Sequence, residues 1–219
     1  MVQSLSERLE SPVGLKTLVF NLDGTLVDSL LDMVGSVQYA FRVLGLTPPS
    51  LEAVRPWIGR PLESMAASFS PRHVAAICAI YCEHYPKHCA DHARVQPGVP
   101  EVLETLRWRG YKLAVATNKR TDVAMRLLDA VGLSSSLDFV QGAEGVAHKP
   151  APDVIYRLLL RSRSEGAWLV GDTAEDILAG KAAGLKTYAV SWGTQDAETL
   201  RGAHPDVLAD TLEPLLHVT

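Results

Sequence analysis

The sequence contains no apolar run that approaches the length of a membrane span, which takes about 20 consecutive apolar residues. The first residues, Met1–Ser11, are polar and hold no apolar stretch of the signal-peptide type. Cysteine is scarce, since the three cysteines, Cys78, Cys82 and Cys89, are odd in number and make a poor disulfide framework. These absences predict a soluble, cytoplasmic protein from a reducing compartment, with no membrane partner.

The chain also lacks a strong excess of charge of either sign. The chain carries 21 Lys and Arg against 25 Asp and Glu, a net charge of −4, and like charges do not cluster. This balance argues against a nucleic-acid partner, which a basic face would bind. No internal repeat or low-complexity tract is present. The 219 residues, 47% of them hydrophobic, have the length for one large domain plus a small insertion. The sequence leaves the oligomeric state open.

Short apolar runs alternate with helical stretches along most of the chain. The expected strands are Thr17–Asn21, Lys112–Thr117, Asp138–Val140, Ala167–Gly171 and Lys186–Ser191, and the expected helices include Pro100–Arg109, Val123–Val131 and Asp153–Arg161. Such near-continuous apolar strands are typical of a parallel sheet buried on both faces. The alternation therefore predicts an α/β fold with a doubly wound, Rossmann-like parallel sheet. We expect Trp108, Trp168 and Trp192 to pack this frame.

The first two of these strands are separated by about 90 residues, far more than a crossover between parallel strands needs. The intervening segment shows helical periodicity, with breaks at Pro48-Pro49 and Ser70-Pro71. We therefore expect a discontinuous core domain, residues 1–28 and 95–219, and an inserted helical domain, residues 29–94.

The end of the first strand holds the most informative residue. The apolar run to Phe20 is followed by Asn21, Leu22 and Asp23 and then by a Gly-Thr turn. With aspartate at position 21, the strand would deliver two carboxylates that suit a nucleophile and a neighbouring general acid/base acting on a phosphate ester. An asparagine amide is neutral and a far weaker nucleophile. This one side chain therefore governs what the site can do.

The segment resembles the first motif of the haloacid dehalogenase superfamily of phosphohydrolases, in which aspartate, any residue, aspartate, any residue and threonine or valine end the first strand. The chain matches every position of that motif except the first. The resemblance implies that the residue at position 21 is both the nucleophile and a Mg²⁺ ligand. In this chain that residue is Asn21. The resemblance also implies that Asp23 is the general acid/base and, through its backbone carbonyl, another Mg²⁺ ligand.

The other motifs of that superfamily follow in order, each after a predicted strand. Thr117 and Asn118 resemble the second motif, which implies contacts to phosphate oxygens. Lys149 resembles the lysine of the third, which neutralises nucleophile and phosphate as a compact point charge. Asp172 and Asp176 resemble the acids of the fourth motif, which hold Mg²⁺. The resemblance implies that Asp172 is a direct ligand and that Asp176 is either a ligand or a residue that supports one. The carboxyl ends of parallel strands are where α/β sheets bind ligands, which strengthens the resemblance.

Within the helical segment, Trp57–Leu62 resembles the loop that phosphoglycolate phosphatase-like members lower over the active site. Arg60 there would meet a carboxylate or second phosphate of the substrate, or it is a solvated loop arginine. Lys119 would touch the leaving group, or it is a surface lysine that starts a helix. The resemblance implies a Mg²⁺-dependent phosphatase that acts through an aspartyl-phosphate. Its substrate would be a small phosphorylated metabolite: a phosphoglycolate-like phospho-acid, a sugar phosphate or pyrophosphate.

Two hypotheses of different class account for Asn21. In the first, the native protein is a phosphatase, and this chain is an aspartate-to-asparagine variant that is nearly inactive but still holds substrate. In the second, it is a natural pseudophosphatase that serves as a phospho-ligand binding or regulatory module. The retained acid/base, Asp23, favours the first, because a protein freed from catalysis has no need of it. A phosphomutase is a further alternative.

A second group of metal-binding residue types lies in the helical segment: Cys78, Cys82, His84, His88, Cys89 and His92. The group lacks a Cys-x-x-Cys pair, and we expect Tyr85-Pro86 to interrupt the helix. Buried cysteines with surface histidines explain the pattern better than a zinc site does.

Overall fold

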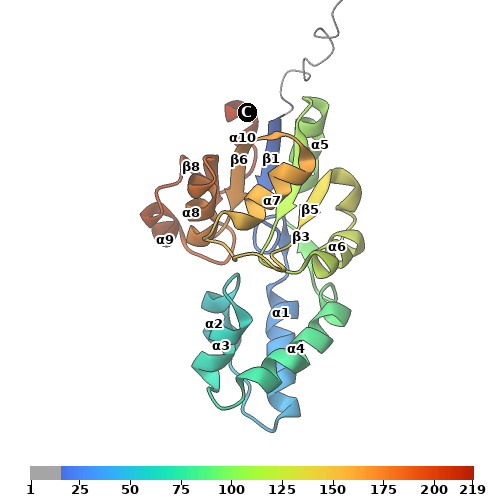
Figure 1. Ribbon diagram of the computed structural model, residues 1–219, viewed down its shortest axis with the longest axis vertical. Coiled ribbons are helices and arrows are strands. Elements are labelled where there is room, and N and C mark those ends of the chain that lie inside the picture. Colours follow the sequence, from blue (N-terminus) through green and yellow to red (C-terminus); the bar gives the residue numbers. More distant parts are fainter. Residues whose placement is uncertain (1–15) are drawn as a thin grey trace, which may run out of the picture.

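The computed structural model describes residues 16–219 and contains a six-stranded parallel sheet (Figure 1). The strands lie in the order β5-β4-β1-β6-β7-β8. Their bounds are Lys16–Phe20 (β1), Lys112–Ala116 (β4), Phe139–Gln141 (β5), Glu165–Gly171 (β6), Lys186–Val190 (β7) and Val207–Ala209 (β8). From β1 the chain first adds strands on one side and then crosses to the other. The direction therefore reverses next to β1, and ligand sites of such sheets form at the carboxyl ends of the strands there.

Helices cover both faces of this sheet. They are α5 (Val99–Trp108), α6 (Thr121–Ala130), α7 (Asp153–Ser162), α8 (Ala174–Ala182), α9 (Ala197–Gly202) and α10 (Leu215–Val218), with a short 3₁₀ turn at Ser134–Ser136. Leu18 and Phe20 of β1 pack with residues of α5 and α6 on one face, whereas Val19 packs with residues of α7 and α8 on the other. This alternation follows from the two-residue period of a strand. The α/β, doubly wound fold predicted from the sequence is confirmed.

Residues 30–88, which follow β1, form a layer of helices beyond the carboxyl edge of the sheet (Figure 1). This helical insertion comprises α1 (Leu30–Val43), α2 (Leu51–Val54), the 3₁₀ turn η2 (Arg55–Trp57), α3 (Leu62–Phe69) and α4 (Val74–His88). Its apolar side chains, such as Phe41, Met65 and Ile77, pack in a cluster of their own. The chain leaves and re-enters the α/β part through an antiparallel pair, β2 (Val27–Asp28) and β3 (Arg94–Val95).

Three expectations differ from the structure. The short strand β8 was not expected, because its three residues carry little pattern. Pro86 lies inside α4, which continues to His88. A proline this close to a helix end removes one backbone bond, to the carbonyl of the exposed Cys82. Trp108 is 87% exposed, since the helical period of α5 turns Leu103 and Leu106 inward instead.

The polar segment Met1–Ser11 lies outside the described residues. Between residues 16 and 219, none of the helices combines the length and the apolar character needed to cross a bilayer.

Candidate active site

Asn21 directly follows β1, and its side-chain amide faces two different surroundings. Its Oδ1 accepts a hydrogen bond from Lys149 Nζ at 3.0 Å. Its Nδ2 donates to the backbone oxygen of Asp23 and to Asp172 Oδ1, both at 3.1 Å, and to Asp176 Oδ2 at 3.3 Å. The amide is therefore oriented by a cation on one side and by acceptor oxygens on the other.

Asp172, just after β6, is fully buried behind Asn21. Its Oδ1 also accepts from Thr25 Oγ1 (2.7 Å), and its Oδ2 accepts from the backbone N–H (2.9 Å) and the hydroxyl (2.8 Å) of Thr194. Burial, together with the nearby charge of Asp176, raises the pKa of Asp172 to about 6, although the threonine hydrogen bonds lower it. Two carboxylates this close in a buried place favour a nearby cation.

Lys149 provides one cation. Its Nζ lies 2.6 Å from Asp176 Oδ1 and donates to the backbone oxygen of Ala116 at 2.9 Å. Asp176 is itself fixed at the start of α8, where it forms a capping box with Thr173. Among residues 16–219, every buried side-chain nitrogen and oxygen has a hydrogen-bond partner. The acidic edge of the sheet is therefore held in place before any ligand binds.

Thr117 and Asn118 follow β4. The buried Thr117 accepts a hydrogen bond from the Lys119 N–H at its Oγ1 (3.1 Å). Asn118 accepts from the Lys149 N–H at its Oδ1 (2.8 Å) and donates from Nδ2 to the backbone oxygen of Gly59 (2.8 Å). Asn118, in the loop after β4, thus connects this loop both to the loop that carries Lys149 and to the helical insertion.

Lys119 contacts the expected acid/base. Its Nζ lies 2.7 Å from Asp23 Oδ1, which also accepts a hydrogen bond from Ser29. On its other side Lys119 donates to the hydroxyl of Tyr85 on α4 and lies 4.5 Å from the centre of that ring. The side chain is 6% exposed, so the alternative of a surface lysine is wrong. In the part of the chain that the structure describes, Asp23 Oδ2 takes part in no hydrogen bond.

Arg60 lies in the loop between η2 and α3. Its Nε is 3.5 Å from Glu175 Oε1 of the α/β part, and its guanidinium lies 5.8 Å from the centre of the Trp57 ring. The side chain is 46% exposed. The preceding residue, Gly59, has a φ of +84°, which glycine adopts at little cost. This loop therefore contacts the α/β part through both Gly59 and Arg60.

A cavity of about 550 Å³ lies between the carboxyl edge of the sheet and the helical insertion. The sequence-predicted residues that line it are Asn21, Asp23, Arg60, Thr117, Asn118, Lys119, Lys149 and Asp176. Asp172 does not reach the cavity surface. The structure thus brings the predicted residues together, with Asp172 in a layer behind the others.

Several residues of the site were missed from the sequence. Thr25, which donates to Asp172, is the threonine of the first motif, so the sequence contained a signal for this residue. Thr194, in the loop after β7, and Ser29, before α1, lie in segments with no motif. Tyr85 is one of several aromatics in the insertion, and no sequence pattern distinguishes it. Their roles depend on contacts between distant parts of the chain.

The cysteines and histidines of the insertion do not form a shared centre. His88 contacts Asp91 (2.8 Å) and stacks on His84, while His92 contacts Asp32 (2.7 Å). Burial raises the pKa of the Cys78 thiol to about 11, which keeps it protonated at neutral pH. Across residues 16–219, no group of three or more His, Cys, Asp or Glu side chains is placed to hold a metal.

The oxygens around Asn21 Nδ2 suit Mg²⁺ in kind, because carboxylate and carbonyl oxygens are its preferred ligands. The Asp23 carbonyl and Asp172 Oδ1 converge on that nitrogen within 3.1 Å. Asn21 meets them with N–H donors, while its single side-chain oxygen faces Lys149. Turning the amide over would set its NH₂ group against the Lys149 ammonium. An aspartate would offer one oxygen to each side, so the donor set fits a magnesium ion better with aspartate than with asparagine.

A family model described as a haloacid dehalogenase-like hydrolase matches residues 18–190. A probable phosphatase, IndB, of Dickeya dadantii is 36% identical over 91% of this chain and 91% of its own. A phosphoglycolate phosphatase of Aquifex aeolicus is 31% identical over 82% of this chain and 86% of its own. A solved haloacid dehalogenase-like hydrolase structure from Streptococcus pneumoniae is 30% identical, with a TM-score of 0.85 over 94% of this chain and 99% of its own. The chain belongs to the haloacid dehalogenase-like hydrolase family.

Proposed function

We propose that this site is that of a Mg²⁺-dependent phosphatase of small phosphorylated metabolites, in which Asn21 nearly abolishes turnover. Phosphatase names among the relatives support the reaction class. The observation that carries the proposal is the place of residue 21, between the Lys149 ammonium and the oxygens of Asp23 and Asp172. A carboxylate there would contact both a cationic side chain and a bound metal. Residues 29–94 would act as a cap, and residues 1–28 and 95–219 would carry the chemistry.

With aspartate at position 21, one carboxylate oxygen would attack phosphorus as the bond to the leaving oxygen breaks. Asp23 would give its proton to that oxygen and then take one from the water that hydrolyses the aspartyl-phosphate. Thr117 and Lys149 would hold the remaining phosphate oxygens. Bound Mg²⁺, held by Asp172, the Asp23 carbonyl and position 21, would neutralise phosphate charge.

Asparagine changes rate and affinity by different amounts. It removes the nucleophile, so the chemical step fails. It also removes a negative charge that would repel a phosphate dianion by about 4 kcal/mol at short range and intermediate dielectric. At the same time it weakens the Mg²⁺ site, because its one side-chain oxygen is directed to Lys149. We expect binding of a phosphorylated ligand to survive better than turnover.

A natural pseudophosphatase that binds a phospho-ligand is a second candidate, favoured by one specific observation. The Asn21 side-chain N–H groups donate hydrogen bonds to the Asp23 carbonyl, Asp172 and Asp176. The site is therefore paired in the absence of a cation, which suits a binding module.

The test is phosphate release with Mg²⁺ from small phosphate esters and pyrophosphate, measured for this chain and for Asn21→Asp. We expect turnover by Asn21→Asp at least about 10³-fold above that of this chain, because a nucleophile is restored. The double variant Asn21→Asp/Asp23→Asn is the matched control and should lose most of the gain. If folded, Mg²⁺-binding Asn21→Asp releases no phosphate, the phosphatase proposal fails. Transfer of phosphate between substrate hydroxyls would then indicate a mutase.

Thermal unfolding tests the magnesium part separately. Asn21→Asp places a third carboxylate beside Asp172 and Asp176, and their mutual repulsion should lower the unfolding temperature without Mg²⁺. Saturating Mg²⁺ should restore it by roughly 5–10 °C, as expected for a ligand at about 100 times its Kd. This chain should shift by less than about 2 °C at the same concentration. Equal shifts in the two proteins would show that Asn21 does not impair the metal site.

A further inference from the structure

The two sides of the cavity differ in character, and the side built by the helical insertion is mostly apolar. Its contributions include Met33 and Val37 of α1, Trp57 of η2, Leu62 of α3 and Tyr81 of α4. Ligand pockets use such surfaces to bury apolar parts of a ligand and use a few polar groups to orient it. A phosphate held at the sheet edge would therefore have its leaving group against an apolar surface.

Aromatic side chains stand in two different elements of this apolar side. Trp57 comes from the segment before α3, and Tyr81 and Tyr85 come from α4, where their rings stack at 5.1 Å with 19° between the planes. In residues 16–219, neither Trp57 Nε1 nor the Tyr81 hydroxyl makes a hydrogen bond. Both side chains are partly buried and line the cavity. Aromatic side chains in a cavity wall suit a planar ring, which packs against them by stacking or edge-to-face contact.

The charges of the cavity argue against a second anionic group. Each lysine and arginine that lines it already faces a carboxylate: Arg60 and Glu175 (3.5 Å), Lys119 and Asp23 (2.7 Å), Arg120 and Asp122 (3.0 Å), Lys149 and Asp176 (2.6 Å). Glu63 adds a negative group on the insertion side. A second carboxylate or phosphate on the ligand would compete for these cations and meet Glu63. This disfavours phosphoglycolate-like acids and pyrophosphate.

The size of the cavity points the same way. Its volume of about 550 Å³ lies within the range of roughly 300–1,000 Å³ for pockets that enclose drug-sized ligands. A two-carbon phospho-acid would leave most of the apolar side in contact with water.

We propose that the ligand is a phosphate monoester whose leaving group carries a planar, uncharged aromatic ring, as in a nucleoside 5′-monophosphate. This rests on the proposed function for the position of the phosphate. The ring would lie against the side that Trp57 and Tyr81 provide, and the phosphate would lie at the sheet edge.

A matched pair of substrates tests the ring directly. Uridine 5′-monophosphate and ribose 5-phosphate share the phosphorylated ribose and differ by the base. With Asn21→Asp and Mg²⁺, kcat/KM should be about tenfold or more higher for the nucleotide, as expected for one base stacked on aromatic side chains. Phosphoglycolate and pyrophosphate should be poorer than both. Phenyl phosphate distinguishes a general aryl preference from a need for ribose.

Binding to this chain gives a readout that needs no turnover. In calorimetry, the Asn21 protein should bind uridine 5′-monophosphate more tightly than ribose 5-phosphate. If Asn21→Asp hydrolyses nothing but this preference holds, the proposed function fails and the ligand class stands. If Asn21→Asp hydrolyses ribose 5-phosphate or phosphoglycolate as well as the nucleotide, the ligand class is overturned and the phosphatase stands.

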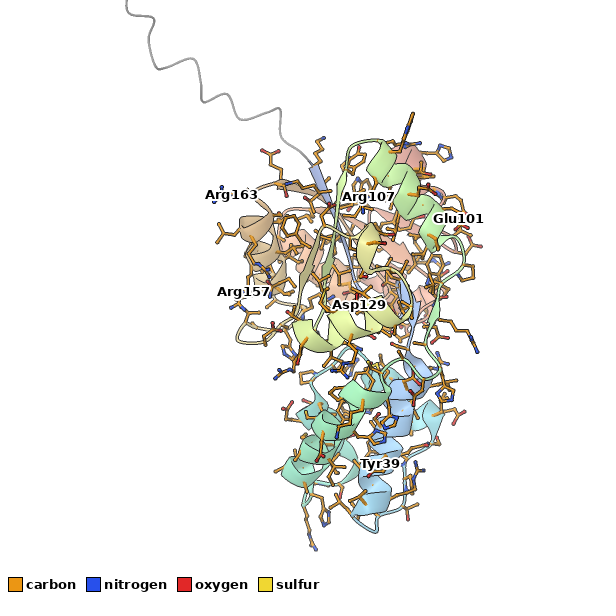
Figure 2. All side chains as sticks on the ribbon, turned by 90° about the vertical axis from the view of Figure 1, so that its right-hand side faces the viewer. Tyr39, Glu101, Arg107, Asp129, Arg157 and Arg163 are labelled. Carbon is orange, nitrogen blue, oxygen red and sulfur yellow. The ribbon has the colours of Figure 1, made fainter. Side chains whose placement is uncertain are left out.

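Two variants locate the ring. Trp57→Leu and Tyr81→Leu, each in the Asn21→Asp protein, should bring the nucleotide-to-ribose phosphate ratio towards one. Tyr39→Leu is the matched control, because Tyr39 is exposed on α1 and does not line the cavity. Figure 2 shows it on the helical insertion, away from the sheet. An unchanged ratio in both folded cavity variants would contradict the placement.

Discussion

The two sides of the cavity are built by different means. The sheet side is almost wholly polar, and its groups are held by hydrogen bonds to one another and to strand ends, as with Lys149 between Asn21, Asp176 and the Ala116 carbonyl. The insertion side is mostly apolar and rests on helices that pack in a cluster of their own. A buried polar network tolerates little change, whereas a helical surface can vary in side chains and keep its core. The sheet side therefore suits chemistry that stays the same, and the insertion side suits the selection of the ligand.

The largest stability difference between the two regions should come from their lysine ion pairs. Lys149→Met in this chain leaves Asp176 buried without its cation and should cost about 3–5 kcal/mol of unfolding free energy. Lys87→Met removes the exposed pair with Glu83 on α4 (3.4 Å) and should cost less than about 1 kcal/mol. Urea unfolding measures both. Similar losses would show that burial does not set the sheet side apart.

Two glycines with a left-handed backbone conformation, one in each region, give a more closely matched comparison of the two regions. Gly24, after β1, has a φ of +80°, and an added Cβ would lie 2.1 Å from Asp172 Oδ2. Gly45, in the insertion, has a φ of +67° and open space around it. Gly45→Ala should cost about 1–2 kcal/mol for the backbone alone. Gly24→Ala should cost about 1–3 kcal/mol more, because Asp172 must move. Equal values for the two variants in thermal unfolding would mean that the acidic edge adapts freely.

The smallest effect is expected where the two sides meet. The Arg60 and Glu175 pair is partly exposed, so Arg60→Gln should change the unfolding free energy by less than about 1 kcal/mol. In the Asn21→Asp protein it should also leave the order of substrates unchanged, with nucleotides ahead of phosphoglycolate. A selective rise in KM for phosphoglycolate would instead show that Arg60 binds a second anionic group.

Apart from the short β8, the strands of the sheet were more predictable than the details of the helices. The apolar runs at Lys112–Ala116 and Lys186–Val190 indicate buried strands on their own, because each is strongly apolar over its length. Pro86 and Trp108 went against expectation: α4 continues through Pro86 at the loss of one backbone hydrogen bond, and Trp108 lies on an exposed face of α5. Local preference does not decide between such outcomes. Packing against the neighbouring elements does.

By itself, the sequence determined five of the six strands of the main sheet and the motif residues that follow them, because each motif is a local pattern tied to one strand end. It also identified Asn21 as the decisive residue. The tertiary structure alone decided that Asn21 Nδ2 contacts Asp172, 151 residues away, that Lys119 contacts Asp23 and Tyr85, and that an apolar side faces the acidic edge. Those contacts join distant segments, and they exist because the sheet gathers its strand ends along one edge and the insertion packs over that edge.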